Sequence, residues 1–147
     1  MKLKLALISA FAALSVGAAR ADQDNDAITR FGLAGHWAVR CGEQPGPQNP
    51  HRFFVASPIG SPMEQIAGGD PSGNGGVLLL SKVHILSADQ IAYTTVIAGT
   101  LFNIMLTKNG NKHRTMDVVS AAGQAITSHG ILMATGVETF WLERCSD

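Results

Sequence analysis

GHWAVRC, at residues 35–41, is the stretch that decides the fold, and TFWLERC, at residues 139–145, matches it near the other end of the chain. Each stretch is rich in apolar residues, contains one of the two tryptophans and ends on one of the two cysteines. We predict that they are the first and last strands of a single closed β-structure, joined by a disulfide between Cys41 and Cys145. Two buried free thiols are the alternative. In the entropy model, closing a loop of roughly a hundred residues stabilises the fold by about 4–5 kcal/mol.

The N-terminus has the features of a secretory signal peptide. Lys2 and Lys4 form a positive n-region, residues 5–19 form an apolar h-region, and Ala19-Arg20-Ala21 is a small-x-small cleavage site. A membrane anchor is the competing interpretation. It is disfavoured because the apolar run is shorter than the ~20 residues of a span and no second run of that length follows.

We therefore expect a signal peptide at residues 1–21 and one β-barrel domain at residues 22–147, in a periplasmic or secreted protein. The whole chain has 11 basic and 11 acidic residues, and removing the leader takes away three of the basic ones. The mature chain is then slightly acidic and has no basic stripe. Nucleic acid and anionic membrane surfaces are therefore not expected as partners, and no membrane span is expected.

Between the two cysteine-containing stretches, short strand-like runs alternate with turn residues. The runs are residues 51–57, 77–86, 90–98, 101–108, 112–119, 125–127 and 131–134. No segment of twelve or more residues in the mature chain shows helical periodicity, and residues 27–33 are expected to form a single turn at most. The pattern predicts an all-β fold, a small antiparallel meander barrel of about eight strands, because closure removes exposed edges.

Two connections are expected to make binding contacts, because binding residues favour loops on a rigid scaffold. Residues 42–50 form a proline-rich connection that cannot be regular structure. Residues 58–76 contain six glycines and three prolines, and form either a functional lid or a mobile loop. Composition favours the mobile loop, at least for residues 68–76.

The hairpin at residues 101–119 has two possible registers. A two-residue turn at Asn-Gly places Leu106 opposite His113, whereas a three-residue loop places it opposite Arg114. We predict the three-residue loop, because it keeps the apolar residues on the buried face. In the other register His113 and Asp117 point inward and make a polar pocket.

A glycine and a tryptophan at the start of the first strand, Gly35 and Trp37, combine with a lone arginine at the end of the last strand, Arg144. This set resembles the lipocalin and calycin pattern, in which the tryptophan packs across the barrel floor against the arginine. Exported β-barrel protease inhibitors of bacteria look similar, with a Gly-x-Trp opening and one disulfide. In those inhibitors the disulfide lies early in the chain, whereas here it would join the first strand to the last.

The resemblance and the disulfide place Cys145 differently. Arg144 beside Trp37 puts Cys145 near the start of the first strand, with Cys41 four residues further along. At ~3.3 Å per residue that gap is ~13 Å, beyond the ~7 Å between Cα atoms that a disulfide tolerates. Either the chain bends after Trp37, or the final residues curl back, or one of the two interpretations is wrong.

The sequence gives little support for catalysis or metal binding. The five histidines are scattered without metal-ligand spacing, no serine lies in Gly-x-Ser-x-Gly, and both cysteines are assigned to the bridge. Glu138 and Glu143 lie on opposite faces of the last strand. We expect no enzymatic activity, no metal and no cofactor.

Aromatic and large apolar residues either line a ligand cavity or fill the core of a small barrel, and core filling is favoured. The candidate ligand-binding residues are Trp37, Phe53, Tyr93, Phe102, Met116 and Trp141, with Phe140 in the same aromatic set. We expect an exported, non-enzymatic binding protein with a lipocalin-like barrel, holding a small apolar ligand or docking a protein.

Two other functions remain open. One is an inhibitor of an exported hydrolase, of the protease or lysozyme type, that inserts Asp22–Arg30 as an extended segment. The other is an accessory subunit of an envelope complex, for which an exposed apolar patch would be the clue.

Overall fold

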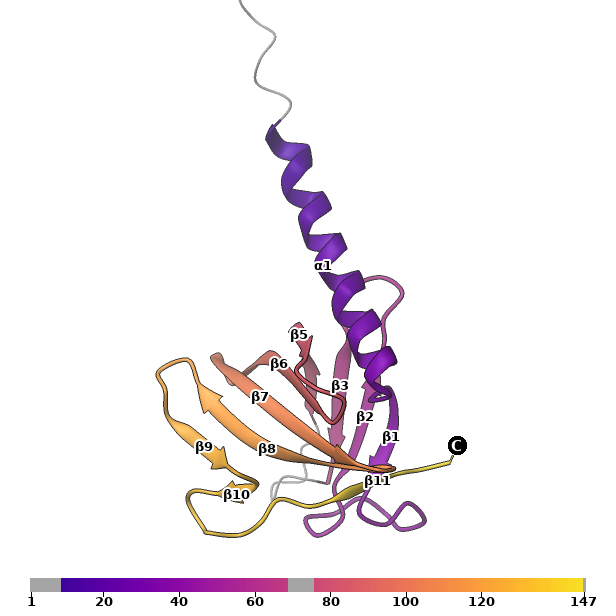
Figure 1. Ribbon diagram of the computed structural model, residues 1–147, viewed down its shortest axis with the longest axis vertical. Helices are drawn as coiled ribbons and strands as arrows, with labels where there is room; N and C mark the ends of the chain where they lie inside the picture. Colours follow the sequence, from indigo (N-terminus) through magenta and orange to yellow (C-terminus); the bar gives the residue numbers. More distant parts are fainter. Residues whose placement is uncertain (1–8, 69–75, 147) are drawn as a thin grey trace, which may run out of the picture.

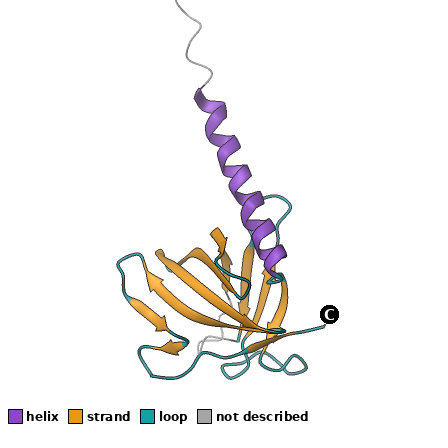
Figure 2. Ribbon diagram, in the orientation of Figure 1, coloured by secondary structure: helices purple, strands orange, loops and turns teal. Residues whose placement is uncertain are grey.

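The computed structural model describes residues 9–68 and 76–146, which form one helix and an eleven-stranded antiparallel sheet (Figures 1 and 2). The elements are α1 (Ser9–Phe31), β1 (Gly35–Ala38), β2 (His51–Val55), β3 (Met63–Ala67), β4 (Gly76–Leu79), β5 (Ser81–Ile85), β6 (Gln90–Ile97), β7 (Thr100–Asn109), β8 (Lys112–Ser120), β9 (Ala125–Ser128), β10 (Ile131–Leu132) and β11 (Leu142–Arg144). The prediction of a mostly β, antiparallel fold is confirmed.

The sheet is not closed into a barrel, so that part of the prediction is wrong. The strand order is β4-β3-β2-β1-β11-β8-β7-β6-β5, with β9 added to β8 and β10 added to β9. The edge strands β4 and β5 follow one another in the chain, where the sequence predicts one strand. The backbone turns away at Leu80, whose amide donates to the carbonyl of Pro62, and Lys82 adopts a positive φ of 51°. This break puts β4 and β5 in different ladders instead of pairing them.

The helix is the largest departure from the expected all-β fold. Within its described side chains, the buried residues Asp24, Ala27, Ile28 and Phe31 recur at helical spacing. The pattern escapes a search for apolar periodicity because one of its four positions is an aspartate. The helix ends at Phe31; the next residue, Gly32, has a φ of 78°, and the amide of Leu33 donates back to the carbonyl of Ile28.

Polar anchors join the C-terminal half of α1 to the sheet, while its N-terminal half projects away (Figure 1). The carboxylate of Asp24 accepts the amides of Lys82 and Val83, at 3.1 and 2.7 Å. Asn25 accepts the amide of Ser57 and donates to the carbonyl of Gly60. Residues 22–30 are therefore a docked helix, and the expected extended segment for insertion into a hydrolase is wrong.

The first and last strands of the chain meet as predicted. β1 and β11 are antiparallel neighbours, with Trp37 opposite Arg144, and the Cys41–Cys145 disulfide has a Cα separation of 5.4 Å. Both features coexist because the chain bends after β1, where the amide of Glu43 donates to the carbonyl of Arg40. Of the three explanations considered from the sequence, the bend after Trp37 is correct.

Arg144 ties this junction to the end of the helix. Its guanidinium donates to the carbonyls of Gly32 and Ala34, at 3.0 and 2.7 Å, and lies 5.5 Å from the centre of the Trp37 ring. Gly35 has a φ of 134°, and a Cβ at this position would lie 3.1 Å from the Arg144 guanidinium. A side chain at Gly35 would therefore push the arginine away from the tryptophan.

The β7–β8 hairpin has neither of the two registers considered from the sequence. Asn109 pairs with Lys112 around a two-residue turn, so Leu106 lies opposite Thr115. A bulge at residues 116–117 then places Ile104 opposite Val118. A bulge adds one residue and so exchanges the faces of the strand beyond it.

The prediction of a three-residue loop is therefore wrong. His113 and Thr115 face inward before the bulge, and Val118 faces inward after it. Asp117 faces outward, where its carboxylate accepts the amide of His129.

The core lies between the inner face of the sheet and the end of α1. Its buried residues are Ala27, Ile28, Phe31, Leu33, Trp37, Phe54, Leu80, Val83, Ile91, Tyr93, Ile104, Leu106 and Leu142. The sequence assigned β3 to a glycine- and proline-rich connection, because few of its residues are apolar. The part of that connection predicted to be mobile lies mostly at residues 69–75, outside the described residues.

Candidate functional site

A buried polar cluster lies on the inner face of the sheet, among the core residues. It is formed by Arg52 on β2, Glu64 on β3, Tyr93 on β6 and Thr115 on β8. Arg52 makes an ion pair with Glu64 and donates to the hydroxyls of Thr115 and Tyr93, both at 3.1 Å. The Tyr93 hydroxyl donates to the second oxygen of Glu64 at 2.8 Å. Strands far apart in the sequence are therefore joined by one network.

Burial sets the ionisation of this cluster. The Glu64 side chain is fully buried and that of Arg52 is 12% exposed. Burial alone would lower the pKa of Arg52, but the charges of Glu64 and Tyr93 and their hydrogen bonds raise it above its usual value. Burial and the Glu64 carboxylate raise the pKa of Tyr93 well above its usual value. The cluster is thus an ion pair of Arg52 and Glu64 with no net charge, and the neutral Tyr93 hydroxyl is hydrogen-bonded to it.

His113 lies beside this cluster and is 1% exposed. Its ring stands edge-on to Trp37 and Phe54, with centroid distances of 4.5 and 5.7 Å. Neither ring nitrogen has a hydrogen-bond partner among the described residues. Burial and the charge of Arg52 lower the pKa of His113 well below its usual value, so the ring is neutral at pH 7. A neutral imidazole has one donor and one acceptor, and an unpartnered buried group of this kind calls for an explanation.

Chemically, the cluster can hold β2, β3, β6 and β8 together, or it can bind one polar group of a ligand. Both Glu64 oxygens already accept hydrogen bonds, and Arg52 is neutralised by Glu64. Both ring nitrogens of His113 are without a partner among the described residues, so the neutral ring has one unused donor and one unused acceptor. In the described part of the chain, no group of three or more His, Cys, Asp or Glu residues is arranged to hold a metal ion.

The structure divides the six predicted ligand-binding residues among four environments. Trp37 and Tyr93 are in the core, and Phe102 packs against it. Phe53 is on the other face of β2, where it stacks on His36. Met116 is half-buried at the bulge of β8, and Trp141 is exposed. The six residues therefore do not converge on one cavity.

The sequence missed most of the buried cluster. Glu64 lies in a segment that the sequence predicts to be a loop. Arg52 is followed by two phenylalanines, which predict a strand that packs in the core but no polar site. His113 was identified only through the alternative hairpin register. No local signal marks the pair, because Arg52 lies between a histidine and a phenylalanine and Glu64 lies between a methionine and a glutamine.

A second candidate site lies outside the core, at residues 125–141, which we call the apolar lobe. The lobe contains β9 and β10 and extends from β8 at the margin of the molecule (Figure 1). Seven large apolar residues in it are at least 36% exposed: Ile126, Ile131, Leu132, Met133, Val137, Phe140 and Trp141. Its one acidic residue, Glu138, pairs with Arg114 of β8 at 3.5 Å, and the Arg114 guanidinium lies 4.8 Å from the centre of the Trp141 ring.

Comparison with known protein-family models, with curated proteins and with solved structures found no match. Among the described residues, no helix is long and apolar enough to cross a membrane. The disulfide between Cys41 and Cys145 is compatible with a periplasmic or extracellular location.

Proposed function

We propose that the protein is an exported, non-enzymatic binding protein that docks a protein partner through the apolar lobe. The observation that carries this proposal is the set of seven exposed large apolar side chains within residues 126–141. Export rests on the leader at residues 1–21 and on the disulfide. Large exposed apolar patches commonly mark interaction sites, and these seven side chains come from one short segment of the chain.

The composition of the lobe supports docking to protein. Aromatic residues, methionine and arginine are enriched at the centres of protein interfaces, and the lobe combines Phe140, Trp141 and Met133 with the adjacent Arg114. Glu138 is the one residue of the lobe that carries a full charge at pH 7, and it is already paired. Burying this surface therefore requires the desolvation of few charges.

The proposal can be tested with a matched pair of lysine substitutions. Met133→Lys introduces a charge at a lobe residue that is 58% exposed, and Leu79→Lys does so at a β4 residue that is 62% exposed. After crosslinking in the envelope of the producing cells, we expect Met133→Lys to lose a partner that the unmodified protein and Leu79→Lys both retain. Equal partner recovery with both variants, or loss with both, contradicts docking through the lobe.

A second candidate function, a small ligand held against the inner face, is favoured by one observation. The two unpartnered ring nitrogens of His113 are a buried donor and a buried acceptor that a hydroxyl or amide of a ligand can satisfy. The contact of Trp37 with Arg144 supports a lipocalin-like arrangement of the same face. Because Arg52 is neutralised by Glu64 and His113 is neutral, we expect an uncharged ligand.

Native mass spectrometry of protein from its own host tests this second function. A non-covalent small-molecule adduct is expected on the unmodified protein and absent from His113→Phe, which fills the same space without a polar atom. His84→Phe, at an exposed position of β5, is the control. An adduct that persists in His113→Phe contradicts an interior ligand held by His113.

A further inference from the structure

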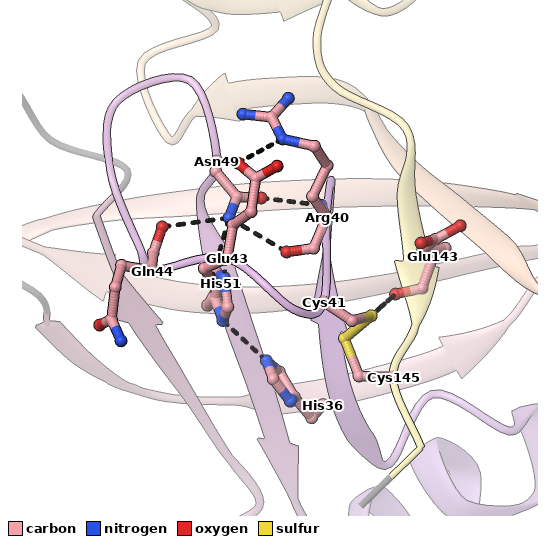
Figure 3. The surroundings of a disulfide bond; sticks show 9 residues. All are labelled: His36, Arg40, Cys41, Glu43, Gln44, Asn49, His51, Glu143 and Cys145. Carbon is pink, nitrogen blue, oxygen red and sulfur yellow. Dashed lines mark hydrogen bonds and ion pairs between the residues drawn. A yellow bond between two sulfur atoms is a disulfide. The ribbon is translucent and has the colours of Figure 1, made fainter.

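His36 and His51, on neighbouring strands of the outer face, form a hydrogen-bonded chain with Asn49 (Figure 3). His36 Nε2 lies 2.9 Å from His51 Nδ1, and His51 Nε2 lies 3.1 Å from the amide nitrogen of Asn49. The His36 ring stacks on Phe53, with centroids 4.3 Å apart. His51 and Asn49 are both buried, so water is excluded from the inner end of the chain.

Asn49 holds together the loop at residues 40–49, which carries Cys41. Its amide nitrogen lies within hydrogen-bonding distance of three loop carbonyls, those of Arg40, Glu43 and Gln44. Its amide oxygen accepts the backbone N–H of Arg40 at 2.8 Å. Since the carbonyls need a donor and the N–H needs an acceptor, this amide orientation is the one that satisfies the loop.

The orientation of Asn49 fixes the tautomers of both histidines. Asn49 presents an N–H to His51 Nε2, so that nitrogen accepts and the His51 proton sits on Nδ1. His51 Nδ1–H then donates to His36 Nε2, which leaves the His36 proton on Nδ1. The donors run in one direction from Asn49 to His36, and every nitrogen between them is already used.

An additional proton on either ring opposes one of the donors of this chain. On His51 it would sit on Nε2 and oppose the Asn49 amide. On His36 it would sit on Nε2 and oppose His51 Nδ1–H. Burial and the charge of His36 lower the pKa of His51, and the carbonyl of Glu43 only partly offsets them.

Four of the charged groups on neighbouring elements are held in ion pairs. Arg40 and Glu43, on the loop, pair with each other at 2.6 Å. Glu143 of β11 lies in register with Lys112 of β8. Arg52 of β2 and Glu64 of β3 pair on the opposite face of the sheet. None of these six side chains is hydrogen-bonded to either imidazole within the described residues.

We propose that the His36–His51 pair is a proton-operated catch on the loop at residues 40–49. At neutral pH the pair holds Asn49, and Asn49 holds the loop. Acidification through the histidine range separates the two rings and releases Asn49. The loop then stays attached to β11 through the Cys41–Cys145 disulfide but loses its fixed shape, and this loop includes most of the connection expected to make binding contacts.

The tautomers provide a direct test on the unmodified full-length protein. Long-range ¹H–¹⁵N correlation spectra at pH 7.5 are expected to show both His36 and His51 protonated on Nδ1, with the exposed His84 as an internal reference. A proton on Nε2 of His51 would overturn the proposal, because the chain of donors would then be broken at neutral pH.

Hydrogen exchange tests the release of the loop. After correction for intrinsic rates, the amides of Arg40, Gly46 and Asn49 are expected to lose about tenfold in protection between pH 7.5 and 5.0. Tenfold is the effect on the opening equilibrium when one group has a pKa about one unit lower in the closed loop than in the open loop. Amides of β6 and β7 should keep theirs, which separates loop release from global unfolding.

His51→Gln is the decisive variant, because a glutamine can accept from Asn49 and donate to His36 but cannot take up a proton. We expect it to retain loop protection at pH 5.0, while His84→Gln loosens as the unmodified protein does. Equal loosening in His51→Gln and in the unmodified protein contradicts the catch.

Discussion

Two arginine–glutamate pairs show how differently the core and the apolar lobe use the same residue types. Arg52 and Glu64, in the core, have side chains that are 12% and 0% exposed, and Arg52 also donates to Thr115 and Tyr93. Arg114 and Glu138, at the lobe, are 18% and 76% exposed, with Trp141 beneath the guanidinium. Water screens the lobe carboxylate, whereas the core carboxylate depends entirely on its protein partners.

Burial, more than pairing, decides whether a charged pair is needed for the stability of the fold. In the core, each ion would be expensive without its partner, so the pair fixes which strands are neighbours. At the lobe, the glutamate can lose its partner and remain hydrated. The lobe is therefore free to be covered by another protein, while the core cluster is committed to the fold.

The largest expected effect is the loss of the core carboxylate. Glu64→Ala leaves Arg52 buried and unpaired, and we expect it to lower the free energy of unfolding by about 3–5 kcal/mol in urea denaturation. Glu138→Ala, the matched change at the lobe, should cost no more than about 1 kcal/mol. Equal losses in the two variants would show that burial does not separate the pairs.

A smaller effect is expected from acid. Burial lowers the pKa of His113, so the unfolded chain binds a proton more readily than the folded protein does. Stability from this group is complete above pH ~6.5 and is lost as pH falls below that value, towards the lower pKa of the folded state.

His113→Phe removes the group that titrates. Its free energy of unfolding, measured between pH 7.5 and 5.0, should therefore fall less steeply than that of the unmodified protein. Part of the slope should remain, because burial also lowers the pKa of His51. An unchanged slope in His113→Phe would contradict a buried neutral His113.

The smallest effect should come from Arg114 at the lobe. Arg114→Ala removes the contact with Trp141 and the pairing with Glu138, and we expect a loss of about 1 kcal/mol in the same urea experiment. Arg52→Ala serves as the core counterpart and should cost several times more. A larger loss for Arg114→Ala would mean that the lobe is part of the stabilising core.

Residue patterns predicted the features that depend on short segments and covalent chemistry. The pairing of the first strand with the last and the Cys41–Cys145 bridge were both identified from residue type and position. β3 was missed because only two of its five residues, Met63 and Ile66, are large and apolar. The inward-facing residue of this strand, Glu64, is stabilised by Arg52 on β2. Local sequence patterns do not reveal that contact.

The helix and the hairpin register show a second limit. At α1, an aspartate occupies a core-facing position because two backbone amides of β5 satisfy it. At β8, the inward-facing residues are the polar His113 and Thr115 before the bulge and the apolar Val118 after it. In both exceptions a polar group has its partner on a distant segment: Asp24 accepts from β5, and Thr115 accepts from Arg52 of β2.

By itself, the sequence determined that the chain is rich in antiparallel strands and that its first and last strands are joined by a disulfide, because alternation and cysteine content are local properties. Only the tertiary structure decided that the sheet stays open between β4 and β5, that a helix packs on the core, and which charges are buried. Those outcomes depend on whether a buried polar group finds a partner, and the partner is set by the folding of the whole chain.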